Sequence, residues 1–309
     1  MGVELIKVKA EDDGMRLNRW FLKYYPGLSL SRFNKLVRTK QIKVDGGKAD
    51  SGLKLAVGQE VRVPPLSAEQ RPPEGEKGIS NRDEEFIRSL VIYKDDHIIA
   101  INKPSGLAVQ GGTNTRRHVD GMLEGLRFEL TEAPKLVHRI DKDTSGVLVL
   151  ARSRQSAEVL TKAFRERDLH KTYLALVRGV PKPAAGEIKA PLEKCGEKME
   201  VLSEGKKAVT AYAVLDEVGD KFALVEASPL TGRTHQIRAH LEYIGCPIAG
   251  DDKYFGAQRQ RFANLADKLF LHAYKIDLSG IYNKKLVITA PLPEHFRQAF
   301  DVLGLSFKE

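Results

Sequence analysis

A short stretch of this sequence concentrates side chains that can transfer protons or bind anions. Residues 136–146 read LVHRIDKDTSG and stand directly before the apolar run VLVLA. A polar cap on a buried strand is the ordinary interpretation, because turns are polar. The density of charge argues for more than a cap. Five ionisable residues fall within six consecutive positions: His138, Arg139, Asp141, Lys142 and Asp143.

Several common chemistries fit this stretch poorly. His235 and His240 are five positions apart and face different sides of a helix, so they add no compact metal-ligand set to His138 and Asp141. Ser145 lies too close to that histidine and aspartate for a stacked nucleophile, base and orienting group, and no nucleophile elbow is present. The sequence also lacks a phosphate-binding loop and a dinucleotide fingerprint.

What remains is a carboxylate between basic residues. An adjacent positive charge favours the ionised form of a carboxylate. Asp141 is therefore suited to nucleophilic attack or proton abstraction rather than to service as a general acid.

Two later segments carry further candidate residues. KTYLALVRG at 171–179 alternates as a strand and holds Tyr173, and an isolated strand tyrosine is most often a core residue with a solvated hydroxyl. LTGRTHQIRAHLEYIG at 230–245 predicts a turn and then a helix. Its basic residues either form a solvated helix start or bind phosphate and hold an aspartate. They are Arg233, His235 and Arg238, opposite an apolar stripe of Ile237, Leu241 and Ile244.

The N-terminal fifth of the chain holds most of its excess positive charge. The net charge is +9, and residues 1–64 contain thirteen Lys or Arg against seven Asp or Glu. Apolar residues at helical spacing predict a helix that ends at Pro26, and a second helix over 29–40. Short alternating segments then predict two or three small strands. The apolar residues are Leu17, Trp20, Phe21 and Tyr24 in the first helix, and Leu30, Phe33, Leu36 and Val37 in the second.

The second helix has a basic arc opposite its apolar one. This basic arc could be a solvated face, but it continues into the following strands and could hold phosphates, which supply affinity without sequence information. Residues 14–64 resemble the small RNA-binding domain first seen in ribosomal protein four of the small subunit. The family's first helix commonly carries an aspartate after Arg-Leu, where this chain has Asn18. The predicted RNA-binding residues are Arg32, Lys35, Arg38, Lys40 and Lys43.

Composition and segmentation predict two domains. Residues 1–64 form the small α/β domain, the polar Pro- and Gly-containing residues 65–84 a linker, and residues 85–309 a larger domain. Strands without regular helix alternation predict an α+β fold with a mixed, mostly antiparallel sheet and flanking helices. No apolar run of about 18 residues and no secretory signal are found, so we expect a soluble, cytoplasmic protein. We also expect a monomer. In the larger domain we expect two short β segments around a tight Asp-Asp turn within 91–104. Further strands are expected at 147–151, 172–178, 209–215, 221–227 and 284–290, and helices at 154–167 and 234–244.

Five motifs in order give the larger domain a strong resemblance to the RluA family of pseudouridine synthases. They are NKPSGLAVQGG, HRIDKDTSG, KTYLA, TGRTHQIRAH and FLHA. The resemblance implies the pseudouridine synthase fold and places Asp141 as catalytic aspartate, Arg238 as its partner and Tyr173 as the tyrosine that stacks on the target base and assists proton removal. It also implies that Leu271 packs beside Tyr173, and that Arg139 enters the RNA stack where the uridine leaves it.

The implied reaction isomerises uridine in large-subunit ribosomal RNA. It breaks the bond between ribose and ring nitrogen, turns the base over and rejoins it through carbon, and it needs no redox cofactor, metal or nucleotide donor. Asp141 either attacks the anomeric carbon or removes a ribose proton. The substrate is ribosomal RNA or a ribosome assembly intermediate. The rival hypothesis is a non-catalytic RNA-binding or ribosome-assembly protein that keeps the fold for binding, which would need none of Asp141, Tyr173 and Arg238.

Overall fold

The protein divides into two units, Met1–Gly78 and Ile79–Glu309, each of which is described by itself. The computed structural model describes residues 3–25, 27–66, 79–112, 115, 117–166, 169–255, 265–283 and 285–307. Most of the predicted linker, residues 67–78, lies outside the described residues. The last four residues of the predicted linker are helical, because α3 (Asn81–Ser89) begins there with Ser80 as its N-cap.

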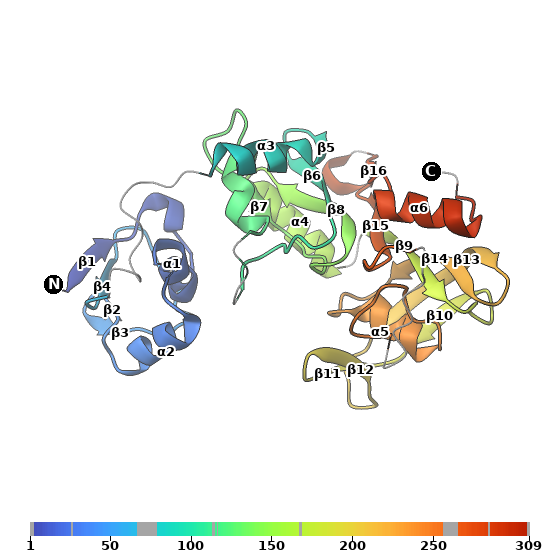
Figure 1. Cartoon of the computed structure of the whole chain (residues 1–309). Helices are drawn as coiled ribbons and strands as arrows, with labels where there is room; N and C mark the ends of the chain where they lie inside the picture. The colour runs from blue at the N-terminus through green and yellow to red at the C-terminus, as the bar shows by residue number, and fades with distance from the viewer. Residues whose placement is uncertain are drawn as a thin grey trace. The chain divides into compact units, whose positions relative to one another are not determined.

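The first unit is a small antiparallel sheet covered by two helices (Figure 1). Trp20, Phe21 and Phe33 are fully buried between them, as the helical spacing predicts. One expectation is wrong: Leu30 is 49% exposed, because it occupies the first turn of its helix and faces solvent. The helices are α1 (Leu17–Tyr24) and α2 (Leu30–Arg38), after a short 3-10 turn η1 (Ala10–Asp12). The strands are β1 (Glu4–Lys7), β2 (Lys43–Val44), β3 (Gly47–Lys48) and β4 (Glu60–Val63), in the order β1-β4-β2-β3.

The second unit is built on a ten-stranded sheet whose main path runs β10-β13-β14-β9-β15-β8-β6-β5 (Figure 1). Neighbouring strands pair antiparallel except β15 and β8, which run parallel. A separate hairpin is formed by β11 (Leu192–Cys195) and β12 (Lys198–Val201). The sheet strands are β5 (Val91–Lys94), β6 (Ile98–Lys103), β7 (Lys135–Leu136), β8 (Ser145–Ala151), β9 (His170–Arg178), β10 (Ala185–Lys189), β13 (Val209–Val218), β14 (Phe222–Pro229), β15 (Leu271–Asp277) and β16 (Val287–Thr289).

Helices cover the sheet and explain its composition. Side chains of α3 and of the 3-10 segment η3 (Asp120–Leu126) pack on one face of β6 and β8, and those of α4 (Arg154–Glu166) pack on the other. Every residue of β8 is therefore buried, and its sequence is an apolar run rather than an alternation. α5 (Gln236–Tyr243) and α6 (Glu294–Leu303) pack with β9, β14 and β15 in the largest core. A short 3-10 segment η4 (Ile281–Asn283) follows β15.

This architecture confirms the predicted α+β class with a mostly antiparallel sheet. The central strand β15 was not predicted, although it joins the two halves of the sheet. In the described part of the chain, no helix is both long and apolar enough to cross a bilayer.

The parallel contact between β8 and β15 is unusually close. Ser145 pairs with His272, and Gly146 pairs with Ala273. Gly146 has φ +110°, and a Cβ there would stand 2.2 Å from the Ala273 carbonyl oxygen. Only glycine fits this position without displacing the neighbouring strand. The contact fixes the chain just after the charged loop.

Candidate active site

The charged loop is anchored at its start by a neutral histidine. The Nε2 atom of His138 accepts a 2.8 Å hydrogen bond from the Val149 amide, and the ring stacks on Phe164 with centroids 4.2 Å apart. Burial lowers the pKa of His138 to about 3, and the positive charge of Lys171 acts in the same direction. His138 therefore positions the loop and is not charged at neutral pH.

A buried lysine fastens the middle of the loop to the segment that follows β6. Lys103 Nζ donates to the carbonyl oxygens of Pro104, Leu107 and Lys142 at 3.0, 2.8 and 2.8 Å. Ser105 Oγ adds a 2.7 Å bond to the Asp143 carbonyl oxygen. Burial lowers the pKa of Lys103 to about 7, while the nearby negative charges of Asp143 and Asp141 oppose that shift. The backbone carbonyl oxygens of Lys142 and Asp143 thus accept the hydrogen bonds that hold the loop in place.

Asp141 faces the start of α5, and its side chain is 28% exposed. Its Oδ2 lies 3.6 Å from Arg238 Nη1 and 3.9 Å from His235 Nε2. The other two guanidinium nitrogens of Arg238 donate 2.7 Å bonds to the two oxygens of Asp251. Arg238 is only 4% exposed, so it is not part of a solvated helix face. Its role as the partner of Asp141 stays a prediction.

Asp251 is itself held by backbone donors. The amides of Lys253 and Tyr254 donate to its Oδ1 at 2.9 and 3.1 Å, and its side chain is fully buried. Burial acts to lower the pKa of Arg238, but the hydrogen bonds and charge of Asp251 outweigh it and raise that pKa. The guanidinium therefore presents a fixed positive charge to Asp141.

His235 links Asp141 to a second buried partner. Its Nδ1 lies 3.1 Å from the Tyr254 hydroxyl, which also accepts a 2.8 Å bond from the Met199 amide. The ring of Tyr254 lies under the Arg238 guanidinium at 5.1 Å. His235 has φ 49°, a left-handed conformation that costs energy outside glycine and is often found at functional sites. Burial lowers the pKa of His235, against the opposing charge of Asp141.

Tyr173 lies on β9 at the junction of the two large cores. Tyr173 pairs with Ala273 of β15 and Ala227 of β14. It also packs against the core that contains the buried Leu271. Burial raises the pKa of the Tyr173 hydroxyl well above its ordinary value, and the charge of Asp141 raises it further. The phenol is therefore protonated at neutral pH.

The remaining predicted residues lie at the edge of this arrangement or outside it. Arg139 is exposed and donates a 3.4 Å bond to Gln110 Oε1. Arg233 donates to the Lys207 carbonyl oxygen at 3.2 Å. The predicted RNA-binding residues belong to the first unit, where all are exposed except the half-buried Lys43. Ser145 bonds not His138 but His272, at 2.9 Å. No cluster of three or more His, Cys, Asp or Glu suited to a metal occurs among the described residues.

Three positioning residues were missed from the sequence: Lys103, Asp251 and Tyr254. Lys103 stands in the NKPSG segment at the end of an apolar strand, where a buried charge must be paired. Asp251 and Tyr254 stand in AGDDKYFG, a short segment with turn residues and no chemical signature of its own. Only the fold shows that this segment lies behind Arg238.

Comparison with known proteins identifies the same region. Residues 97–243 match the family model described as RNA pseudouridylate synthase. The chain is 34% identical to ribosomal large subunit pseudouridine synthase C of Vibrio vulnificus, over 98% of both chains, and 35% identical to the protein of that name in Escherichia coli, over 97% of both. The structure of human RNA pseudouridylate synthase domain containing 4 matches 74% of this chain and 99% of its own, with a TM-score of 0.64 and 29% identity.

Proposed function

The chain belongs to the RluA family of RNA pseudouridine synthases, and we propose that it isomerises specific uridines of large-subunit ribosomal RNA. Relatives of nearly equal length carry that substrate in their names. We include in the proposal that the protein acts in the cytoplasm as a monomer, on free ribosomal RNA or on an assembly intermediate.

The observation that carries the proposal is the setting of Asp141. The Asp141 carboxylate lies 3.6 Å from a buried guanidinium that Asp251 fixes from behind, so it faces a positive charge of fixed position. An ionised carboxylate can attack the anomeric carbon of the target uridine or remove a ribose proton, and both routes remain open. Asp141 is partly exposed, so a nucleotide extruded from its stack can reach it.

We assign the surrounding residues as follows. Arg238 and His235 hold Asp141, and the Tyr173 ring stacks on the extruded base with Leu271 behind it. Because the Tyr173 hydroxyl starts protonated, it can donate a hydrogen bond to the base and can accept a proton only after losing its own. Arg139 fills the space that the uridine leaves in the RNA stack, which offsets part of the few kcal/mol that extrusion costs. Arg233 binds RNA phosphate.

The first unit contributes affinity in this proposal. The exposed basic face of α2 and the residues that follow it neutralise RNA phosphates without reading sequence. These residues are Arg32, Lys35, Arg38, Lys40 and Lys43.

The decisive experiment maps pseudouridine in ribosomal RNA from cells that lack this protein. Cells are complemented with wild type, Asp141→Ala or Asp143→Asn, the last being an exposed acidic neighbour in the same loop. We expect certain sites to disappear on deletion, to return with wild type and Asp143→Asn, and to stay absent with Asp141→Ala. If no site disappears, the protein does not have this activity; if Asp141→Ala restores every site, Asp141 is not the catalytic group.

A further inference from the structure

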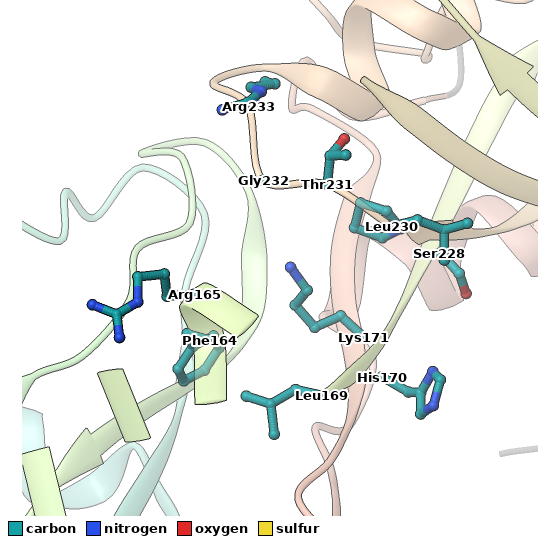
Figure 2. A pocket seen from close by; sticks show the side chains of 11 residues that line it. Phe164, Arg165, Leu169, His170, Lys171, Ser228, Leu230, Thr231, Gly232 and Arg233 are labelled. Carbon is teal, nitrogen blue, oxygen red and sulfur yellow. The ribbon is translucent and has the colours of Figure 1, made fainter. Parts of the chain in front are cut away.

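A basic pocket of about 260 Å³ lies between the end of α4, the start of β9 and the loop that joins β14 to α5. Figure 2 shows Lys171 extending from β9 into this space, with Arg165 on the α4 side and Arg233 at the opposite rim. Phe164 and Leu230 add apolar walls. None of the eleven lining residues that the structure describes is acidic. The pocket therefore favours an anion with an attached apolar or aromatic group.

Each wall of the pocket continues into an element that carries a candidate active-site residue. Lys171 precedes Tyr173 by two positions, so both side chains lie on one face of β9, about 7 Å apart along the strand. Arg233 precedes His235 by two positions in the loop before α5. Phe164 stacks on His138, which anchors the loop of Asp141. The pocket is thus adjacent to the place where the target base must sit.

Electrostatics support the same placement. The positive charge of Lys171 contributes to the lowered pKa of His138, which is consistent with a position of this lysine near the anchor of the charged loop. Arg233 is held by its bond to the Lys207 carbonyl oxygen, which leaves its terminal nitrogens for a ligand. The Leu230 side chain is largely exposed, at 42%, beside these cations.

We propose that this pocket binds the nucleotide next to the target uridine in the RNA strand. Its phosphate lies between Lys171, Arg165 and Arg233, and its base packs against Leu230 and the edge of Phe164. A single nucleotide combines the charge and the apolar face that the pocket offers. The pocket would hold the strand while the neighbouring uridine is extruded. This inference rests on the proposed function for the identity of its ligand.

The test measures binding and turnover with the full chain and an unmodified transcript of bacterial large-subunit ribosomal RNA. The variant Arg165→Ala/Lys171→Ala removes two of the three cations. The control Arg154→Ala/Lys162→Ala makes the same change in net charge on the same helix, at side chains that are 67% and 66% exposed and do not line the pocket. Thermal unfolding checks that each variant is folded. If the double variant is not folded, the single variant Arg165→Ala replaces it, because the Arg165 side chain is 73% exposed.

We expect the pocket variant to raise KM about tenfold with a smaller effect on kcat. We also expect it to reduce the slope of log affinity against log salt by about 0.7, the contribution of the single phosphate that these cations share. The variant Lys171→Arg keeps the positive charge and should keep the wild-type salt slope. Equal slopes and KM values for the pocket variant, the control and wild type would overturn the proposal.

A second probe tests the base. Once a target uridine is mapped, a short RNA containing it is made with an abasic nucleotide on one side or the other. We expect wild type to bind one of the two abasic RNAs several-fold more weakly than it binds the intact RNA. Leu230→Ala should bind that abasic RNA and the intact RNA equally well. Loss of the same size in both proteins would rule out base binding by this pocket. If wild type forms no pseudouridine at all, the proposed function fails, whereas the salt slopes still decide whether the pocket binds RNA.

Discussion

Arg238 holds the buried carboxylate of Asp251 with two hydrogen bonds of 2.7 Å each. The arginine is therefore not a free cation that Asp141 attracts; it is fixed from behind, and Asp141 at 3.6 Å is the carboxylate that remains accessible to substrate. Two aspartates share one guanidinium, but only one of them is exposed. This division of roles determines what substitution of each should do.

We expect Asp251→Asn to keep the fold but lower kcat by tenfold or more. The amide can accept one hydrogen bond from Arg238, but it lacks the charge that aligns the guanidinium. Asp251→Ala should also destabilise the protein by about 3–5 kcal/mol, because it leaves a buried charge without its partner. Turnover and urea unfolding of both variants check this. Asp252→Asn, the next residue in the same segment, is the control, and a similar loss of kcat there would contradict the assignment.

Lys103→Met should impair both stability and turnover. The substitution keeps the length of the side chain but leaves three carbonyl oxygens without their donor, at about 1–3 kcal/mol for each one that finds no water. The loop of Asp141 then loses its connection to the segment after β6. Lys142→Met, at an exposed side chain in that loop, is the matched comparison. Wild-type kcat in Lys103→Met would show that the connection is not needed.

Gly146→Ala should destabilise the second unit by at least about 3 kcal/mol, from positive-φ strain together with overpacking. The added Cβ would collide with the Ala273 backbone across the β8–β15 contact. Gly280→Ala is the control, because Gly280 also has a positive φ but nothing within 4 Å of the added Cβ. Chemical unfolding monitors both variants. Equal losses would mean that strain alone, and not the strand contact, accounts for the effect.

Stability of the second unit should fall as pH drops below about 6.5. Burial lowers the pKa of His138 to about 3 and those of His272 and His295 to about 4, so the folded state keeps them neutral while the unfolded state protonates them. Their contribution is complete above pH 6.5 and is lost as pH falls toward 4, with a slope of up to about 1.4 kcal/mol per pH unit for each histidine.

Urea unfolding between pH 6.5 and 5 isolates this effect from the carboxylates, which titrate lower. His138→Gln should reduce the slope of stability against pH by up to about 1.4 kcal/mol per pH unit. If His138→Gln and wild type show the same slope of unfolding free energy against pH, His138 is not the neutral residue that anchors the charged loop.

The basic arc of α2 should account for more of the RNA affinity than its share of charge. We expect Arg32→Ala/Lys35→Ala/Arg38→Ala to weaken binding of ribosomal RNA and to lower the salt slope by about 2, with little change in kcat at saturating RNA. The matched variant Lys7→Ala/Lys9→Ala/Lys54→Ala removes three exposed charges elsewhere in the same unit. Similar salt slopes for the two variants would show that only net charge matters. Filter binding over a salt series makes the comparison.

The sequence predicts the parts of this protein that depend on local pattern. The stripe of Leu17, Trp20 and Phe21 gives α1, the run VLVLA gives a strand buried on both faces, and the α+β class follows from the order of segments. The motifs likewise single out Asp141 and Arg238. The predictions of the helix, the strand and the fold class hold because the periods of helices and strands are local properties, and the roles of Asp141 and Arg238 stay predictions.

What could not be predicted depends on contacts between distant segments. β15 reads as an ordinary alternating segment, and only its pairing with β8 and β9 makes it central. Asp251 and Tyr254 are positioned by the turn after α5, which places them behind Arg238. Lys103 is buried because a loop about forty residues later supplies one of its acceptors. Leu30 shows the converse, an apolar residue on the predicted arc that stays exposed because nothing packs on it.

The close contact between Gly146 and Ala273 also determines when the site can form during biosynthesis. The loop of Asp141 is complete in the nascent chain long before its supporting strand β15 exists, since the two residues are separated by more than 120 positions. At about 5–20 residues per second, translation needs roughly 6–25 s to cover that interval. During this time the emerging polypeptide already carries the basic first unit, but it has no finished site. Under the proposed function, attachment to RNA through that unit precedes modification, which has to wait for the completed sheet.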